Sequence, residues 1–160
     1  MRRSVPVLAC VLLLLGSGFL PALSRADLDR ITDVSITLKT LADVAAGKAP
    51  LPDGRLIMLT GTVSDVNIIN KEQPTFRVRI ELLSGEWFGE EDVKAYACYV
   101  EFSGPEYFKV FPAKLPANAA PGIIGLSTRV LIVGRAVSIT TTPLGAKHVL
   151  VEGAFVRAIE

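Results

Sequence analysis

Three strand-like runs of this chain each carry a glycine near their centre. They are LIMLTGTVSDV with Gly61, VLIVGRAV with Gly134 and VLVEGAFV with Gly153. Glycine weakens a strand interior by ~0.5–1 kcal/mol relative to alanine, so its repetition needs a structural reason. The coiled strands of a small closed barrel supply one, because glycines and bulges allow the sharp bend. We expect Gly61 to bend a strand that serves both halves of a barrel. We expect Gly134 and Gly153 to relieve crowding where the last two strands coil.

Hydrophobic alternation locates the remaining strands. Apolar residues at 76, 78, 80 and 82 alternate with polar ones, which is typical of a half-buried antiparallel strand. The five predicted strands cover residues 55–66, 75–82, 93–102, 128–140 and 147–159. A short helix is expected after Thr37, which can serve as its N-cap, and Gly47 and Pro50 end it.

The order of these elements predicts the fold class. PEYFKVF (105–111) can form a short helix between the third and fourth strands, and a proline-rich loop follows it. Five strands with such an insertion are typical of an OB-fold, a five-stranded Greek-key barrel in a mainly β chain. An open sandwich or an unrelated meander is the alternative, although five strands are few for a sandwich. We expect a lead-in and helix at 27–54 and the barrel at 55–160.

The N-terminus has the layout of a secretory signal peptide. Arg2 and Arg3 precede an apolar run, and Ser24-Arg25-Ala26 offers a cleavage site. The sequence therefore predicts a periplasmic or secreted protein that begins at Asp27 and keeps no stable membrane span. A membrane anchor, or a lipid anchor at Cys10, is the alternative.

Charge and reactive residues limit the function classes. Without residues 1–26 the chain has 14 Lys and Arg against 16 Asp and Glu, so it has no bulk attraction to nucleic acid. Cys98 is then the only cysteine and His148 the only histidine, with no cluster at metal-ligand spacing. No catalytic pair or phosphate loop emerges. We expect neither enzyme activity nor a cofactor; an enzyme using Cys98 and His148 is the last alternative.

Arg77, Arg79 and Tyr99 are the first candidate ligand-binding residues. OB-folds often bind ligands on the face of strands two and three. The simplest hairpin register places Arg77 opposite Tyr99 and Arg79 opposite Ala97. Such a group can hold phosphate and stack a base. It can also be a solvated surface in which Arg77 lies on Tyr99 as a cation–π pair, and nearby acidic residues would repel phosphate.

Trp87 and Phe88 are the second candidates. SGEWFGEED (84–92) is expected to be a long hairpin loop with these aromatic residues at its tip. They could anchor a partner or fold back over the end of the barrel. The acidic residues around them suit a basic protein or a cation. The partner stays open between a protein, a small polar ligand and, by fold resemblance only, nucleic acid.

The glycine-centred strands resemble a known group. Leu59-Thr60-Gly61-Thr62-Val63, then 130–134 and the closing strand 149–155, are similar to bacterial exported OB-fold domains of the tRNA-anticodon-binding (tRNA_anti-like) type. The resemblance covers residues 36–159 and implies a fold rather than an activity. The periplasmic haem chaperones of cytochrome c maturation are a second resemblance. They carry haem on a histidine after the barrel, whereas His148 begins the last strand.

These observations favour an exported, non-enzymatic OB-fold binding or structural module whose ligand is open. The alternative is a nucleic-acid or oligosaccharide binder that uses the face of strands two and three. A periplasmic haem-carrier-like protein comes third.

Overall fold

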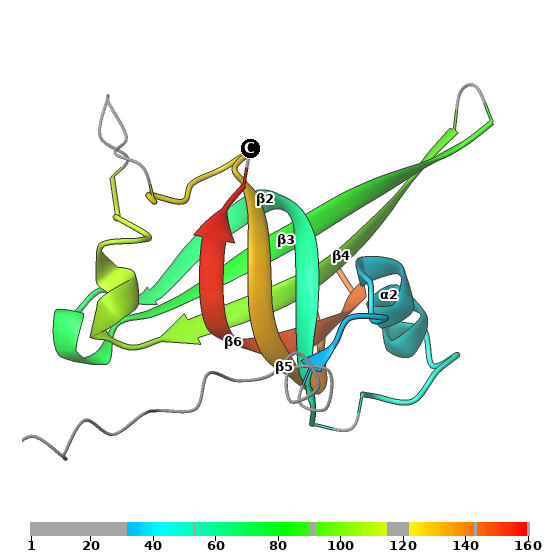
Figure 1. The fold of residues 1–160 in the computed structure, drawn as a ribbon, viewed down its shortest axis with the longest axis horizontal. Coiled ribbons are helices and arrows are strands. Elements are labelled where there is room, and N and C mark those ends of the chain that lie inside the picture. The colour runs from blue at the N-terminus through cyan, green and yellow to red at the C-terminus, as the bar shows by residue number, and fades with distance from the viewer. Residues whose placement is uncertain (1–31, 53, 90–91, 115–121, 143, 160) are drawn as a thin grey trace, which may run out of the picture.

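The computed structural model describes residues 32–52, 54–89, 92–114, 122–142 and 144–159 (Figure 1). The predicted signal peptide, 1–26, lies outside them. The elements are β1 (Thr32–Asp33), α2 (Leu38–Ala45), β2 (Leu56–Asn70), η2 (Gln73–Thr75), β3 (Arg77–Phe88), β4 (Asp92–Ser103), η3 (Pro105–Phe108), β5 (Arg129–Thr141) and β6 (Lys147–Ala158).

The strands close into a ring. Their order is β1-β2-β3-β4-β6-β5, and β2 also pairs with β5. β4 and β6 run parallel, with Tyr99 beside Leu150, while the other pairs of the ring are antiparallel. A five-stranded Greek-key ring with a helical insertion before β5 is the OB-fold, so the predicted fold class is confirmed. The two-residue β1, which lies parallel to the start of β2, was not predicted.

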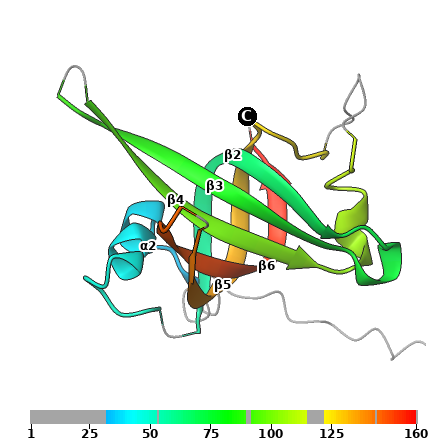
Figure 2. The same ribbon diagram turned by 180° about the vertical axis from the view of Figure 1, so that it is seen from behind.

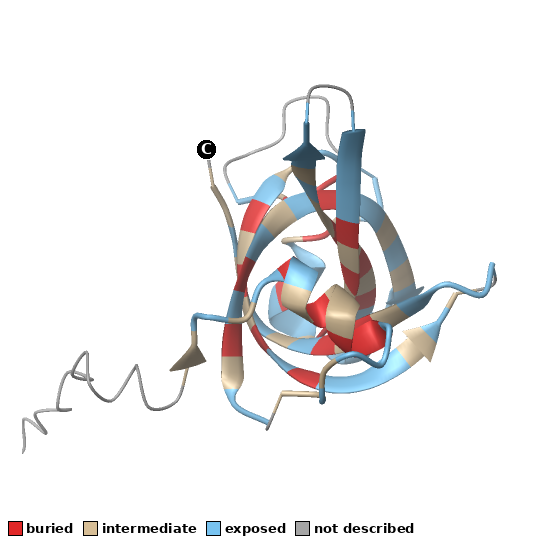
Figure 3. Ribbon diagram, turned by 90° about the vertical axis from the view of Figure 1, so that its right-hand side faces the viewer, coloured by how far each residue is buried: buried red, intermediate tan, exposed pale blue. Residues whose placement is uncertain are grey.

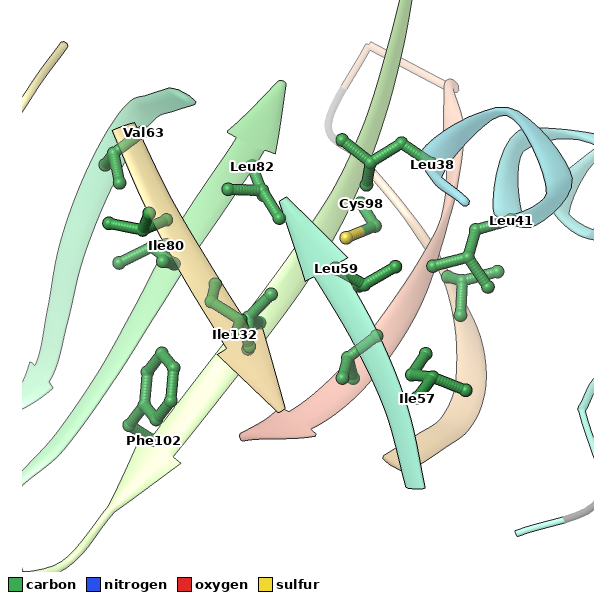
Figure 4. Close-up of a cluster of buried hydrophobic side chains, with 14 of the residues drawn as sticks. Leu38, Leu41, Ile57, Leu59, Val63, Ile80, Leu82, Cys98, Phe102 and Ile132 are labelled. Atoms are coloured by element: carbon green, nitrogen blue, oxygen red, sulfur yellow. The ribbon is translucent and has the colours of Figure 1, made fainter. Parts of the chain in front are cut away.

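The core fills the inside of the ring. Apolar side chains alternate inward along each of the five strands of the ring. The helix α2 lies across one opening of the ring (Figure 3). Leu38 and Leu41 of α2 join the same buried cluster as Leu59, Leu82 and the other residues drawn in Figure 4. Thr37 caps the helix as predicted: its Oγ1 accepts from the Thr40 N–H at 3.2 Å.

The glycines mark close approaches, as the sequence predicts. A Cβ at Gly134 would lie 2.5 Å from the carbonyl oxygen of Glu152, and one at Gly153 would overlap the ring of Phe102. β2 pairs with β5 up to Thr62 and with β3 from Thr62 onwards. Gly61 lies at this change of partner, where an added Cβ would be 2.8 Å from the carbonyl oxygen of Leu83.

The predicted hairpin loop at 84–92 is wrong. β3 runs on to Phe88 and β4 begins at Asp92, so Trp87 and Phe88 are strand residues that pair with Val93 and Asp92. The polar and glycine residues of this stretch are typical of a loop. The backbone hydrogen bonds between β3 and β4 do not depend on side chains, however, so pairing with β4 is enough to keep these residues in a strand. The two strands project beyond the ring (Figures 1 and 2). We call this projection, residues 83–89 and 92–97, the arm.

The predicted hairpin register is also wrong. Arg77 pairs with Ser103, Arg79 with Glu101, and Tyr99 with Glu81. A hairpin's register depends on where its turn lies. Because the strands continue further than expected, the turn lies nearer β4, and each β3 residue meets a partner four positions later.

Candidate binding surfaces

The outward side chains of β3 and β4 on the ring form the first surface, which we call the barrel face. Glu101 lies at its centre and is only 8% exposed. Its Oε2 accepts from Arg77 Nε at 3.0 Å and Nη2 at 2.6 Å. Its Oε1 accepts from Nε of Arg79 at 2.8 Å and also from Nη2. The two predicted arginines do converge, but on a carboxylate that the sequence analysis did not select.

The electrostatics of Glu101 favour its charged form. Burial raises the pKa of this carboxyl, but the hydrogen bonds from Arg77 and Arg79 outweigh burial, so the pKa lies below its usual value. The carboxylate is therefore ionised at neutral pH. It occupies the donors with which the two arginines would grip a phosphate.

Tyr99 is in contact with a different arginine from the one predicted. The guanidinium of Arg79, not of Arg77, lies 5.6 Å from the Tyr99 ring centroid. His148 packs edge-on against the same ring at 5.2 Å, and its Nδ1 is 3.3 Å from the carbonyl oxygen of Ala97. Tyr99 and His148 thus belong to one surface cluster in which each already has a protein partner.

Acidic residues surround this cluster. Glu81 pairs across from Tyr99 and from Asp65 of β2, and Glu152 of β6 lies beside Glu101. Two arginines therefore share the barrel face with four carboxylates. This balance repels a phosphate backbone rather than attracting it.

The arm presents a second surface with a different character. The outer side of the sheet continues from the barrel face through three cross-strand pairs, Leu83–Ala97, Gly85–Ala95 and Trp87–Val93. None of these side chains is polar, and Trp87 is 70% exposed and Val93 53% exposed. We call these six residues the arm face. Trp87 lies on it, whereas Phe88, the next residue, points to the other side.

The opposite side of the arm is polar and tied to α2. Lys39 Nζ donates to Glu86 Oε2 at 2.9 Å, and Tyr96 Oη donates to the same oxygen at 3.0 Å. The ammonium of Lys39 also lies 5.7 Å from the ring centroid of Phe88. The hydrogen bond from Lys39 is the main reason why the pKa of Glu86 lies below its usual value. Phe88 therefore belongs to this bridge and not to a surface shared with Trp87.

Cys98 and His148 do not form a reactive pair. Burial, with a smaller effect from Glu81, raises the pKa of the Cys98 thiol to about 12, so the thiol is protonated at neutral pH. His148 points to Tyr99 and Ala97 instead. Within the described ranges, no three His, Cys, Asp or Glu residues are grouped closely enough to hold a metal ion. None of the described helices has the length and apolar character needed to cross a membrane.

Comparisons with known proteins give structural likeness only. No protein-family model and no curated protein matches the chain, so the resemblance to tRNA_anti-like domains stays a prediction. The second single-stranded DNA-binding protein of Mycobacterium smegmatis is 12% identical, with a TM-score of 0.42 over 64% of this chain and 86% of that one. A small single-stranded DNA-binding protein of Streptomyces coelicolor is 11% identical, with a TM-score of 0.40 over 67% and 94%. Likeness this low carries no argument about what this chain binds.

Proposed function

We propose that this protein is an exported, non-enzymatic OB-fold module that binds another protein through the arm face. The single observation that carries the proposal is the row of apolar side chains left exposed on the arm, with Trp87 at 70% exposure. Exposed apolar patches mark interaction sites, and tryptophan is among the residues that most often anchor interfaces. The bridge from Lys39 to Glu86 supports the opposite side of the arm, so the arm face is presented on a braced ribbon.

Site-specific photo-cross-linking tests this function. A benzoylphenylalanine at position 87 should give an adduct of defined mass in cells that make the protein. The same group at position 155 is the matched control, because Phe155 is also an exposed aromatic strand residue, on β6. The purified partner should then bind the wild type and the Phe155→Ser variant but not Trp87→Ser. Equal adducts at both positions, or none at position 87, would contradict the proposal.

Nucleic-acid binding on the barrel face is the second candidate, favoured by the contact of Arg79 with the Tyr99 ring. Glu101 and its acidic neighbours oppose it. We expect labelled single-stranded oligonucleotides to bind no tighter than the non-specific range of ~10⁻⁴–10⁻⁶ M in fluorescence anisotropy. Submicromolar binding that disappears in the Arg77→Ala/Arg79→Ala variant would replace the protein-binding proposal with this one.

Export has its own test. The N-terminal sequence of the protein recovered from the periplasmic fraction should begin at Asp27, because Ser24-Arg25-Ala26 forms the predicted cleavage site. Recovery of the uncleaved chain from the cytoplasm would contradict this part of the proposal.

A further inference from the structure

One edge of the arm has no neighbouring strand in the described part of the chain. β2 pairs with β3 only as far as Thr62 and Leu83, because the first half of β2 pairs with β5 instead. From Ser84 to Phe88, β3 therefore pairs with β4 alone. An unpaired strand edge is a template for another strand.

The direction of the backbone groups on this edge follows from two contacts. The carbonyl oxygen of Leu83 lies beside Gly61 of β2, and the carbonyl oxygen of Glu81 accepts from Ser64 Oγ of β2 at 3.3 Å. Alternate residues of a strand direct their N–H and C=O groups to the same side. Gly85 and Trp87 therefore direct theirs away from β4, to the side that β2 has left.

A groove runs along this edge. It has a volume of about 550 Å³ and lies between Ser84–Glu86 of β3, Met58–Thr60 of β2 and the segment that leads into α2. A second hollow of about 500 Å³ adjoins it around Thr60–Thr62, Leu83 and Gly85. Leu38, Leu59 and Tyr96 give the first groove an apolar lining. Free backbone groups on one wall and apolar side chains beside them suit an extended polypeptide.

The other edge of the arm, along β4, also has no neighbouring strand among the described residues before Tyr99, where β6 begins to pair, but charged side chains flank it. His148 Nδ1 lies against the carbonyl oxygen of Ala97, so Ala95 and Val93, in the same alternation, also face away from β3. The charged residues Asp92 and Lys94 flank this edge, and charges discourage strand addition. The β3 edge carries Ser84 and Gly85, whose small side chains allow another backbone to approach closely, and its charged residue, Glu86, is already paired with Lys39.

We propose that this groove binds an extended segment of a partner protein, which adds as a strand to the edge of β3 at Gly85 and Trp87. The inference rests on the proposed function, in that the arm is the protein-binding element. Side chains of an added strand alternate between the arm face, beside Trp87, and the apolar lining of the groove. The segment therefore carries β-branched or other apolar residues at alternate positions. A single chain fits, because β2 and the segment before α2 flank the edge on its open side.

Hydrogen exchange on the full chain tests the inference. The probe is a blocked peptide of alternating valine and threonine, added to the ¹⁵N-labelled protein. We expect exchange at the Gly85 and Trp87 amides to slow at least about tenfold at saturation. The Glu86 amide, which already faces β4, should change much less. If neither Gly85 nor Trp87 changes at about 1 mM peptide, a concentration that detects even weak binding, the inference is overturned.

Two proline variants provide a matched pair. Gly85→Pro removes an N–H from the edge of β3 that borders the groove, and Ala95→Pro removes one from the edge of β4 that is flanked by charges. Neither N–H belongs to the ladder between β3 and β4, so both variants should fold. We expect peptide binding to fall at least about tenfold in Gly85→Pro alone, because the variant loses one strand-pairing hydrogen bond and leaves a peptide carbonyl without its donor. Equal losses in both variants would overturn the inference, and the exchange measurement on the wild type stands if either fails to fold.

The outcomes separate this inference from the proposed function. A cross-linked partner whose complex leaves the Gly85 and Trp87 amides unprotected supports protein binding by the arm and overturns strand addition. Protection by the peptide without any cross-linked protein supports strand addition and counts against the proposed partner.

Discussion

The same two strands carry opposite kinds of surface on one side of the sheet. On the ring, the outer side of β3 and β4 holds Arg77, Arg79 and Glu101, which satisfy one another. Beyond the ring, the same side holds Trp87 and Val93 with no polar group. Arg77, Arg79 and Glu101 are complete within the molecule, because each of them has an opposite charge beside it. The apolar part is left exposed, because no described residue covers it. A partner that buried it would gain roughly 25 cal/mol of free energy per Å² of apolar surface.

The largest contrast should appear when a side chain is added to a glycine in each region. Gly134→Val on the ring should lower the free energy of unfolding by about 1–3 kcal/mol, because its Cβ would meet the Glu152 carbonyl. Gly85→Ala on the arm should change it by no more than about 0.5 kcal/mol, because its Cβ meets only the Val93 side chain, at 3.3 Å. Urea midpoints measure both. A raised midpoint for Gly134→Val would contradict the coiled, crowded barrel strand.

Removal of the central carboxylate tests the completeness of the barrel face. Glu101→Gln should cost about 1–2 kcal/mol, since it weakens hydrogen bonds to two partly exposed arginines. Glu152→Gln is the control, because Glu152 is an exposed residue on the neighbouring strand. The freed arginines should also make oligonucleotide binding detectably tighter and salt-dependent. If both variants keep wild-type stability, Glu101 does not organise this face.

Acidification should weaken the stabilising contacts of the barrel face and leave the apolar arm face unchanged. The folded state lowers the pKa of Glu101 from the ordinary value of 4.5, so its stabilising effect is present above that pH and is lost as the pH falls through the lower folded value. Urea midpoints should therefore fall more steeply with acidification in the wild type than in Glu101→Gln. Parallel curves would contradict this prediction.

The smallest effect on stability is expected at the arm face. Trp87→Ser should change the free energy of unfolding by no more than about 0.5 kcal/mol, because the side chain is mostly exposed. Trp87 is the only tryptophan, so its fluorescence emission should hardly shift on unfolding and should move to shorter wavelength when a partner covers it. A large loss of stability would show that the arm packs against something in the free protein.

The sequence was sufficient for the fold because its signals are local and repeated. Alternation along 76–82 and the three strand glycines predicted the strands and their coiling. The site was harder to predict, because the partner of Arg79 depends on the hairpin register. The register depends on where the turn lies, and the loop-like residues Ser84, Gly85 and Glu86 indicate an earlier turn than the true one. Glu101 therefore escaped notice.

A signal for the arm face was nevertheless present. In β3 the apolar residues face inward up to Leu82, and from Leu83 to Trp87 they face outward. Such a change of phase within one strand indicates that the outer side of the sheet, rather than the core side, carries the apolar surface from Leu83 onwards. The predicted strand ends at Leu82 instead, before this change of phase.

The shared strand β2 also sets an order of assembly. The β3–β4 hairpin joins residues close in sequence and can form early, whereas the first half of β2 must wait for β5, where Leu56 meets Arg135. We therefore expect the ring to close last along the β2–β5 seam. In a chain whose ring has not yet closed, Ile57 and Leu59, which are buried in the folded protein, would lie on an exposed strand, and we expect such a chain to be prone to self-association.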